Sequence, residues 1–128
     1  MASTRPTIDE LLEATQEFLE KKIIDVVDAH RAFHTRVAIN VLALVRRELQ
    51  LSPQLAPGEH ERLRTLLGTD GTIVELNDDL CRRLRDKSMD YGSDELFRHL
   101  FETTMGQLSI DNPEYSGYKR ALEESARN

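Results

Sequence analysis

The sequence contains few cysteines, prolines and glycines, and few large aromatic residues. Its 128 residues include one cysteine, no tryptophan, 4 prolines and 6 glycines. The lone Cys81 excludes an intramolecular disulfide and fits a reducing compartment. Because 39% of the residues are hydrophobic, the chain can bury enough apolar surface to offset the entropy of folding, which excludes a disordered protein. The length fits one domain, and we expect a single helical domain over residues 1–128.

Positive charge and long apolar runs are also scarce. Asp and Glu number 23 against 17 Lys and Arg, for a net charge of −6. No basic stripe is therefore available for phosphate backbones, and we expect no nucleic-acid partner. No stretch reaches the roughly 20 apolar residues of a membrane span, and residues 1–12 lack the apolar segment of a secretory signal. By elimination, we expect a cytoplasmic protein that does not bind membranes.

Alternating strand patterns are missing as well, and helical periodicity takes their place. Thr7 and Thr72 are each followed three positions later by Glu, a capping-box pattern that marks helix starts. We therefore predict an all-α fold, an antiparallel bundle of five to six helices. The expected helices cover about 8–26, 31–50, 58–67, 72–87 and 93–111, with a short last helix from Asn112, a flexible arm at 1–6, an undecided stretch at 25–30 and a frayed tail from about 119 to 128.

Proline position and apolar spacing set the details of this bundle. Pro53 disfavours helix at the residue before it, so the second helix should stop there and residues 52–58 should form a loop. Two apolar stripes should face the core. They are Phe33, Val37, Val41, Leu44, Val45 and Leu49 in the second helix, and Leu96, Phe97, Leu100, Phe101, Thr104, Met105 and Leu108 in the fifth. Cys81 should be an inert core thiol, whereas His60 and His99 should lie on the surface.

Few residues point to chemistry. No nucleophile elbow, phosphate-binding loop, dinucleotide fingerprint or paired-cysteine motif occurs, and we predict no catalytic, cofactor-binding or metal-binding residue. His30 and His34 are four apart, as metal-binding pairs are on a helix. However, Arg31 stands where zinc proteases place a glutamate, so a buried or interface histidine is the better interpretation.

Two polar clusters each allow a structural and a functional interpretation. Arg46 and Arg47 lie near the predicted end of a helix, where cations complement the helix dipole. The sharper alternative is an anion contact, because arginine binds phosphate through two parallel bonds. The segment from Asp111 through Asn112 to Tyr115 is locally a helix stop and restart, although its aromatic hydroxyl would also suit an interface. In both cases the structural interpretation is favoured on local evidence.

Four segments carry a resemblance to a known family. They are RPTIDELLEATQEFL at 5–19, FHTRVAINVLALVRREL at 33–49, LNDDLCRRLR at 76–85 and LSIDNPEY at 108–115. In this order they resemble small bacterial proteins, classed as a domain of unknown function, that are encoded beside aminoglycoside-phosphotransferase-like kinases and acyl-CoA dehydrogenases. The resemblance covers most of the chain and rests on the F-H-x-R-V-A-x-N-x-L and I-D-N-P-x-Y motifs.

The resemblance implies a role in acyl-CoA metabolism. In levulinate catabolism, a member of this family is the small subunit that works with the kinase phosphorylating the 4-hydroxyl of a 4-hydroxyacyl-CoA. By resemblance, this chain is a non-catalytic accessory subunit that binds and supports such a kinase. The alternatives are a stand-alone helical binding or scaffold module, homodimeric or not, and a small enzyme or metal protein using His30 and His34.

We expect the kinase to dock on one polar and aromatic patch. Its residues would be Phe33, His34, Arg36, Asn40, Asp111, Asn112 and Tyr115. Arg36 and Asn40 are one turn apart and share a helix face, and polar groups on an otherwise apolar helix need partners. The competing hypothesis is internal, with Arg36 or Asn40 bonding the 111–115 loop and fastening the bundle. Spacing alone leaves both hypotheses open.

Overall fold

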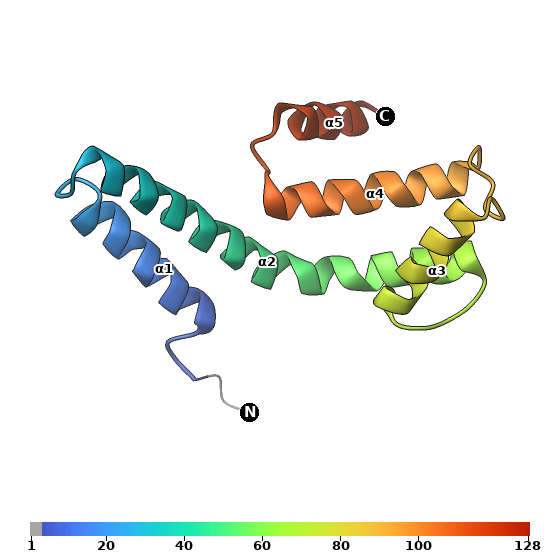
Figure 1. Ribbon diagram of the computed structural model, residues 1–128, viewed down its shortest axis with the longest axis horizontal. Helices are drawn as coiled ribbons and strands as arrows, with labels where there is room; N and C mark the ends of the chain where they lie inside the picture. The colour runs from blue at the N-terminus through green and yellow to red at the C-terminus, as the bar shows by residue number, and fades with distance from the viewer. Residues whose placement is uncertain (1–3) are drawn as a thin grey trace. The chain divides into compact units, whose positions relative to one another are not determined.

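The protein is all-α, as the sequence predicts. The computed structural model describes residues 4–128, and no strand occurs within them. The elements are α1 (Ile8–Phe18), the π-helix η1 (Leu19–Ile23), α2 (Ala29–Leu67), α3 (Ile73–Arg85), α4 (Asp94–Asp111) and α5 (Ser116–Arg127) (Figure 1). The chain divides into two compact units, residues 1–51 and 52–128. The single domain expected over 1–128 stays a prediction, because one domain can contain two compact units.

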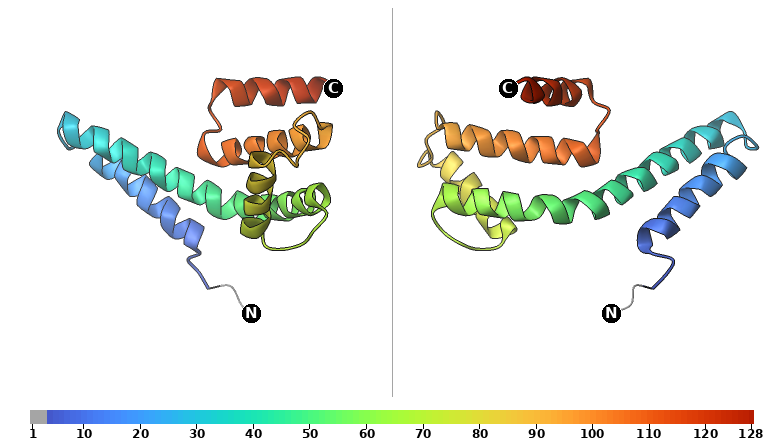
Figure 2. Two further views of the ribbon diagram at one scale, coloured as in Figure 1. Left: turned by 45° about the vertical axis from the view of Figure 1, so that its right-hand side comes forward. Right: turned by 180° about the vertical axis from the view of Figure 1, so that it is seen from behind.

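The first unit is a helical hairpin made of α1, η1 and the beginning of α2. Thr7 starts α1 with the predicted capping box, since its Oγ1 accepts a hydrogen bond from the backbone N–H of Glu10 at 3.1 Å and donates one to the Glu10 carboxylate at 3.2 Å. The two helices lie side by side in the views of Figure 2, and Ile39 of α2 is buried. Of the expected arm at 1–6, residues 1–3 lie outside the described residues.

The undecided stretch at 25–30 contains a turn and a new helix start. Before it, η1 widens the end of the first helix, where the N–H of Ile24 bonds the carbonyl of Leu19 at 3.0 Å. Asp28 then caps the beginning of α2, because its carboxylate accepts the backbone N–H of Arg31 at 2.9 Å. The helix expected over 8–26 is therefore shorter, with α-helix to Phe18 and π-helix to Ile23.

α2 corrects the prediction made at Pro53. The helix runs for 39 residues with Pro53 and Pro57 inside it, so the predicted stop and the loop at 52–58 are wrong. A proline lacks the N–H that would bond the carbonyl four residues earlier, here those of Leu49 and Pro53. Leu49 and Pro53 are both exposed, so water can solvate the freed carbonyls, and the residues between the two prolines favour helix. Despite the length of α2, the described residues contain no helix apolar enough to cross a membrane.

The second unit has a leucine core built by α2, α3 and α4. Its buried members are Leu63, Leu67, Leu76, Leu80 and Leu96, with Leu66, Ile73, Leu84 and Met89 packed against them. Thr72 starts α3 with the second predicted capping box, accepting the backbone N–H of Glu75 at 3.1 Å. The core residues of α3, Ile73, Leu76, Leu80 and Leu84, follow one another at three- and four-residue intervals and so share one face of the helix. Cys81, however, is exposed rather than in the core, because it is one residue and about 100° past buried Leu80.

The core face predicted for α4 is correct at Leu96 and wrong at Phe97, Leu100 and Phe101. The buried residues of α4 are Leu96, His99 and Ile110, whereas Phe97 is 70% exposed and Phe101 is exposed as well. The two phenylalanine rings stack on the outside of the helix with centroids 6.1 Å apart. The surface position expected for His99 is therefore wrong. His99 shares the inward face of α4 because it lies three residues after Leu96.

The last helix begins later and runs further than predicted. Residues 113–114 form a turn, and α5 starts at Ser116, with Tyr115 at its N-cap position but no capping bond from the Tyr115 side chain. The helix expected from Asn112 is therefore displaced. α5 continues to Arg127, through the stretch in which we expected a frayed tail, and lies alongside α4 in Figures 1 and 2.

Two glycines, one inside α2 and one directly after it, should respond in opposite directions to the same substitution. Gly58 lies inside the helix, where a Cβ would sit 3.4 Å from Arg62 Nη1, an ordinary contact with a flexible side chain. Gly58→Ala should therefore raise the free energy of unfolding by about 0.5–1 kcal/mol. Gly68 follows the helix with a φ of 68° and open space around it, so Gly68→Ala should lower the free energy of unfolding by about 1–2 kcal/mol through backbone strain. Urea unfolding measures both, and a destabilising Gly58→Ala would contradict a helix through residues 52–58.

Candidate functional site

The first unit exposes an apolar stripe along α2. We call Phe33, Val37, Val41, Val45 and Leu49, which follow one another at four-residue intervals, the α2 stripe. All five are exposed, Phe33 by 62% and Val41 by 53%. The sequence predicted a core position for them, and that prediction is wrong. Contiguous exposed apolar residues mark interaction sites, so the α2 stripe is the first candidate site.

Polar residues predicted for docking lie on the same helix. Arg36 and Asn40 are both exposed and stand one turn apart. His34 is exposed as well, and its ring meets the rings of Phe33 and His30 edge-on, with centroids 5.4 and 4.5 Å away. Phe33, His34, Arg36 and Asn40 are therefore all accessible in the first unit.

The other three predicted docking residues lie in the second unit, where α4 passes into α5. Asp111 ends α4 and accepts the side-chain N–H of Gln107 at 2.9 Å. The backbone carbonyl of Asn112 accepts the N–H of Tyr115 at 3.1 Å. All three predicted residues are exposed. Two hypotheses therefore stay predictions. In one, these three residues form a single docking patch with Arg36 and Asn40, and in the other, Arg36 or Asn40 bonds the 111–115 loop.

Arg46 joins the two helices of the first unit. Its Nε and Nη2 bond the two carboxylate oxygens of Asp9 at 2.8 and 3.2 Å, and its Nη1 bonds Gln16 at 3.2 Å. Glu13 lies 3.5 Å from Nη2, and Gln50 donates to Asp9 at 3.1 Å. The planar fork of the guanidinium is thus occupied by acceptors of the same chain. An anion contact would have to displace Asp9.

The helix-dipole interpretation of the two arginines is wrong, because α2 continues to Leu67 and the dipole acts only within the last turn. The hydrogen bond from Arg46 lowers the pKa of the Asp9 carboxyl, and the same bond raises the pKa of Arg46. Arg47 is half-buried and also interacts within the chain. Arg46 is therefore a structural residue of the hairpin.

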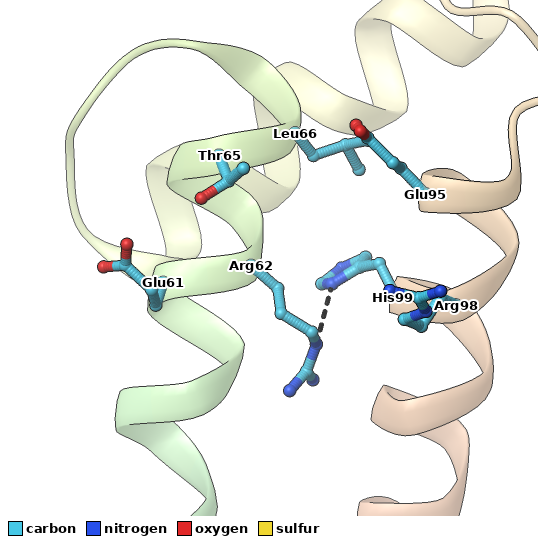
Figure 3. Close-up of a pocket in the computed structure, with 7 residues that line it drawn as sticks. All are labelled: Glu61, Arg62, Thr65, Leu66, Glu95, Arg98 and His99. Carbon is cyan, nitrogen blue, oxygen red and sulfur yellow. Dashed lines mark hydrogen bonds between the residues drawn. The ribbon is translucent and has the colours of Figure 1, made fainter.

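A cavity opens in the second unit between α2 and α4 (Figure 3). Its volume is about 250 Å³, and the lining residues are Glu61, Arg62, Thr65 and Leu66 of α2 with Glu95, Arg98 and His99 of α4. A second cavity of about 250 Å³ lies further along the same two helices, and Arg62 lines it too. Arg62 thus contributes to both cavities.

Arg62 reaches from α2 to three side chains of α4. Its Nε donates to Nδ1 of His99 at 3.4 Å, at the long end of hydrogen-bonding distances. Its Nη2 donates to the hydroxyl of Thr103 at 3.2 Å, and its Nη1 lies 3.1 Å from the Glu102 carboxylate. Figure 3 shows the Arg62 side chain and the His99 ring meeting across the cavity. This bridge fixes the orientation of the His99 ring.

His99 is the buried polar residue of the second unit, with 3% of its surface exposed. Burial lowers the pKa of His99, and the charge of Arg62 lowers it further, whereas Glu59 and Glu102 act in the opposite direction. The imidazole is therefore neutral at pH 7. Because an arginine N–H can only donate, Nδ1 must accept and the ring proton must lie on Nε2.

Neither Arg62 nor His99 is among the site residues predicted from the sequence. The signal that could have found His99 is the spacing 96–99–103–106–110, which alternates steps of three and four residues as the buried face of a helix does. This face has His99 and Thr103 in its middle and the apolar residues Leu96 and Ile110 at its two ends. The neighbouring stripe through Phe97 and Phe101 is more hydrophobic, so hydrophobicity alone favours the wrong face.

His30 and His34, the pair with metal-binding spacing, share one face of α2. His30 and His34 have ring centroids 4.5 Å apart. Within residues 4–128, no three or more His, Cys, Asp or Glu side chains gather in a way that could hold a metal ion. His60 is half-buried and bonds the carbonyl of Gly71 at 2.8 Å, so its role is to hold the loop before α3.

A comparison with protein families places the chain. A family model described as a domain of unknown function, DUF6285, matches residues 25–115. The chain belongs to the DUF6285 family. The matched region includes α2, α3 and α4, whereas α1 and α5 lie outside it. No curated protein matches this DUF6285 chain, and no solved structure matches it either.

The Arg46–Asp9 pair should make the stability of the hairpin depend on acid. Because the pKa of Asp9 is below 3.8 in the folded chain, the unfolded chain takes up a proton first as the pH falls. The stabilisation is therefore present above pH 3.8 and is lost as the pH falls through the lowered pKa of Asp9. Asp9→Asn should lower the melting temperature at pH 7 and flatten this acid dependence. Asp25→Asn, at an exposed carboxylate of the same unit, is the matched control and should do neither.

His99 should make the second unit less stable in weak acid. Since the pKa of His99 is lowered from 6.5, the unfolded chain binds more protons between the two values, and the free energy of unfolding rises with pH there. Stability should be complete above pH 6.5 and should decline as the pH falls toward the lowered pKa. Urea unfolding at a series of pH values measures this slope. His99→Phe should remove it, and an unchanged slope in that variant would mean that another group is responsible.

Proposed function

We propose that this DUF6285 protein is a non-catalytic subunit that docks on an aminoglycoside-phosphotransferase-like kinase acting on a 4-hydroxyacyl-CoA. The observation that carries the proposal is the exposed α2 stripe. A helix that presents apolar side chains every four residues suits the recognition mode in which one helix lies in a groove of its partner. The motif resemblance at 33–49 and 108–115 names the class of partner.

The energetics of the α2 stripe indicate that its polar neighbours also take part. Fully burying a Val, Leu or Phe side chain stabilises a complex by about 1.5–3 kcal/mol relative to leaving it exposed. Because these five side chains are only about half exposed, docking would gain roughly half of that sum, about 4–8 kcal/mol. Association itself costs an estimated 4–15 kcal/mol. The apolar contact alone would leave little affinity, so hydrogen bonds from Arg36 and Asn40 are needed for a stable complex.

The chemistry of the proposed reaction explains why a kinase is required. Hydroxide is a poor leaving group from C4 of a 4-hydroxyacyl thioester, and the thioester does not acidify the C4 proton. Transfer of the γ-phosphoryl group of ATP to the 4-hydroxyl turns that oxygen into a competent leaving group for a later elimination. Phosphoryl transfer depends on positioning, Mg²⁺ and charge stabilisation, all of which belong to the kinase. The part of this chain is to hold or stabilise that enzyme.

A stand-alone helical module is the alternative. The same α2 stripe could pack against its copy in a second chain, because an apolar face of this kind is self-complementary under two-fold symmetry. Size exclusion of this protein alone and with the co-expressed kinase separates the two functions. Co-elution with the kinase supports a function as accessory subunit. A dimer that does not bind the kinase supports a function as stand-alone module.

A charge at the centre of the α2 stripe should abolish docking without unfolding the chain. Val41→Asp should weaken association with the kinase at least tenfold, about 1.4 kcal/mol, because the carboxylate would be buried at the contact. The free energy of unfolding should change by no more than about 0.5 kcal/mol, since the side chain is already exposed. Binding is measured by titration and kinase turnover with and without the subunit. Val74→Asp is the matched control, because Val74 is 71% exposed on α3.

Arg36→Ala distinguishes docking from internal fastening at the polar residues. Docking predicts weaker kinase association with an unchanged melting temperature, whereas fastening predicts a lower melting temperature. The accessory function as a whole fails if the kinase reaches full turnover without this chain. It also fails if Val74→Asp weakens association as much as Val41→Asp does.

A further inference from the structure

His99 presents one hydrogen-bond donor that no other side chain uses. Its Nδ1 accepts from Arg62, so the proton lies on Nε2, and the structure gives Nε2 no bond within residues 4–128. Yet no buried side-chain nitrogen or oxygen in that part of the chain lacks a partner. Nε2 is therefore not sealed in the core. His99 is only 3% exposed and lines this cavity, so the cavity is the space in which Nε2 can donate to a ligand atom that accepts.

The charges around this cavity favour an acceptor without charge. Glu61 and Glu95 balance Arg62 and Arg98 in the lining. Arg62 is further neutralised by Glu102 at 3.1 Å. A carboxylate or phosphate would therefore lose its hydration without gaining a positive field. A neutral carbonyl oxygen loses much less hydration and needs only the N–H of His99.

The remaining wall and the size of the cavity suit a small ligand with one apolar part. Leu66 supplies an apolar wall, and Thr65 adds a hydroxyl. An apolar cavity of about 150 Å³ in another protein holds a benzene ring. A cavity of about 250 Å³ therefore has room for a ring together with one polar group.

We propose that this cavity binds a small neutral carbonyl compound, whose oxygen accepts the Nε2–H of His99 and whose apolar part lies against Leu66. All seven lining residues belong to the second unit, so the site is separate from the α2 stripe. It goes beyond kinase docking and does not depend on it. His99 selects an acceptor, and the balanced arginines and glutamates select against an anion.

Benzamide and benzoate test the proposal because they share a shape and differ in charge. Each is titrated into the full-length protein while the ring nitrogens of the four histidines are followed by NMR. Benzamide should shift the His99 Nε2 resonance saturably and leave His30, His34 and His60 unmoved. Benzoate should bind about tenfold more weakly, because it gains no net positive field for the hydration it loses.

Two variants locate the contact. His99→Phe keeps a ring of similar shape but removes the donor, and it should weaken benzamide binding about tenfold, the contribution of one hydrogen bond. His30→Phe makes the same substitution on exposed α2 and should leave binding unchanged. If His99→Phe does not fold, the wild-type NMR titrations still decide the proposal.

Three results would overturn the proposal. They are benzoate binding as tightly as benzamide, a His99 resonance that does not move at saturation, and benzamide shifts concentrated on the α2 stripe. Val41→Asp should bind benzamide like the wild type. Loss of the ligand site and loss of kinase docking are therefore measured independently.

Discussion

Apolar side chains occupy opposite sides of the first half of α2, and a helix in a two-helix hairpin can cover only one of those sides. Ile39 and Arg46 are seven residues apart and share the side that meets α1, where Ile39 is buried and Arg46 bonds Asp9. Val37 and Val41 are each two residues from Ile39, which turns them about 200° away. The ion pair between Arg46 and Asp9 thus joins the two helices of the hairpin, while the apolar α2 stripe stays exposed and available to a partner. The proposed docking function depends on this division.

The structure was predictable where a signal acts over one turn of helix. Thr7 and Thr72 cap their helices through their own hydroxyls, and Gly68 ends α2 because its φ is positive. These helix starts and ends can be predicted from a few neighbouring residues, without reference to the rest of the chain. Pro53 shows the limit of local rules, because its unfavourable effect on the helix is offset by solvation of an exposed carbonyl and by helix-forming neighbours.

The choice of buried face was not predictable from hydrophobicity. In α4, the stripe through Phe97 is more apolar than the one through His99, yet His99 is buried and Phe97 is exposed. A polar residue is admitted to the inward face because Arg62 supplies its hydrogen bond. Arg62 is 37 residues away in the sequence, so no local pattern around His99 predicts that Arg62 is its partner. The same distance explains why Arg62 was not recognised as a site residue.

The contact of Tyr115 with Gly117 has a consequence for any surface that meets this part of the chain. A Cβ at position 117 would lie 2.7 Å from Cε1 of the Tyr115 ring, so the ring rests in the space that the absent side chain leaves. Any larger residue at position 117 would therefore displace the ring, and with it the aromatic hydroxyl that an approaching surface would meet.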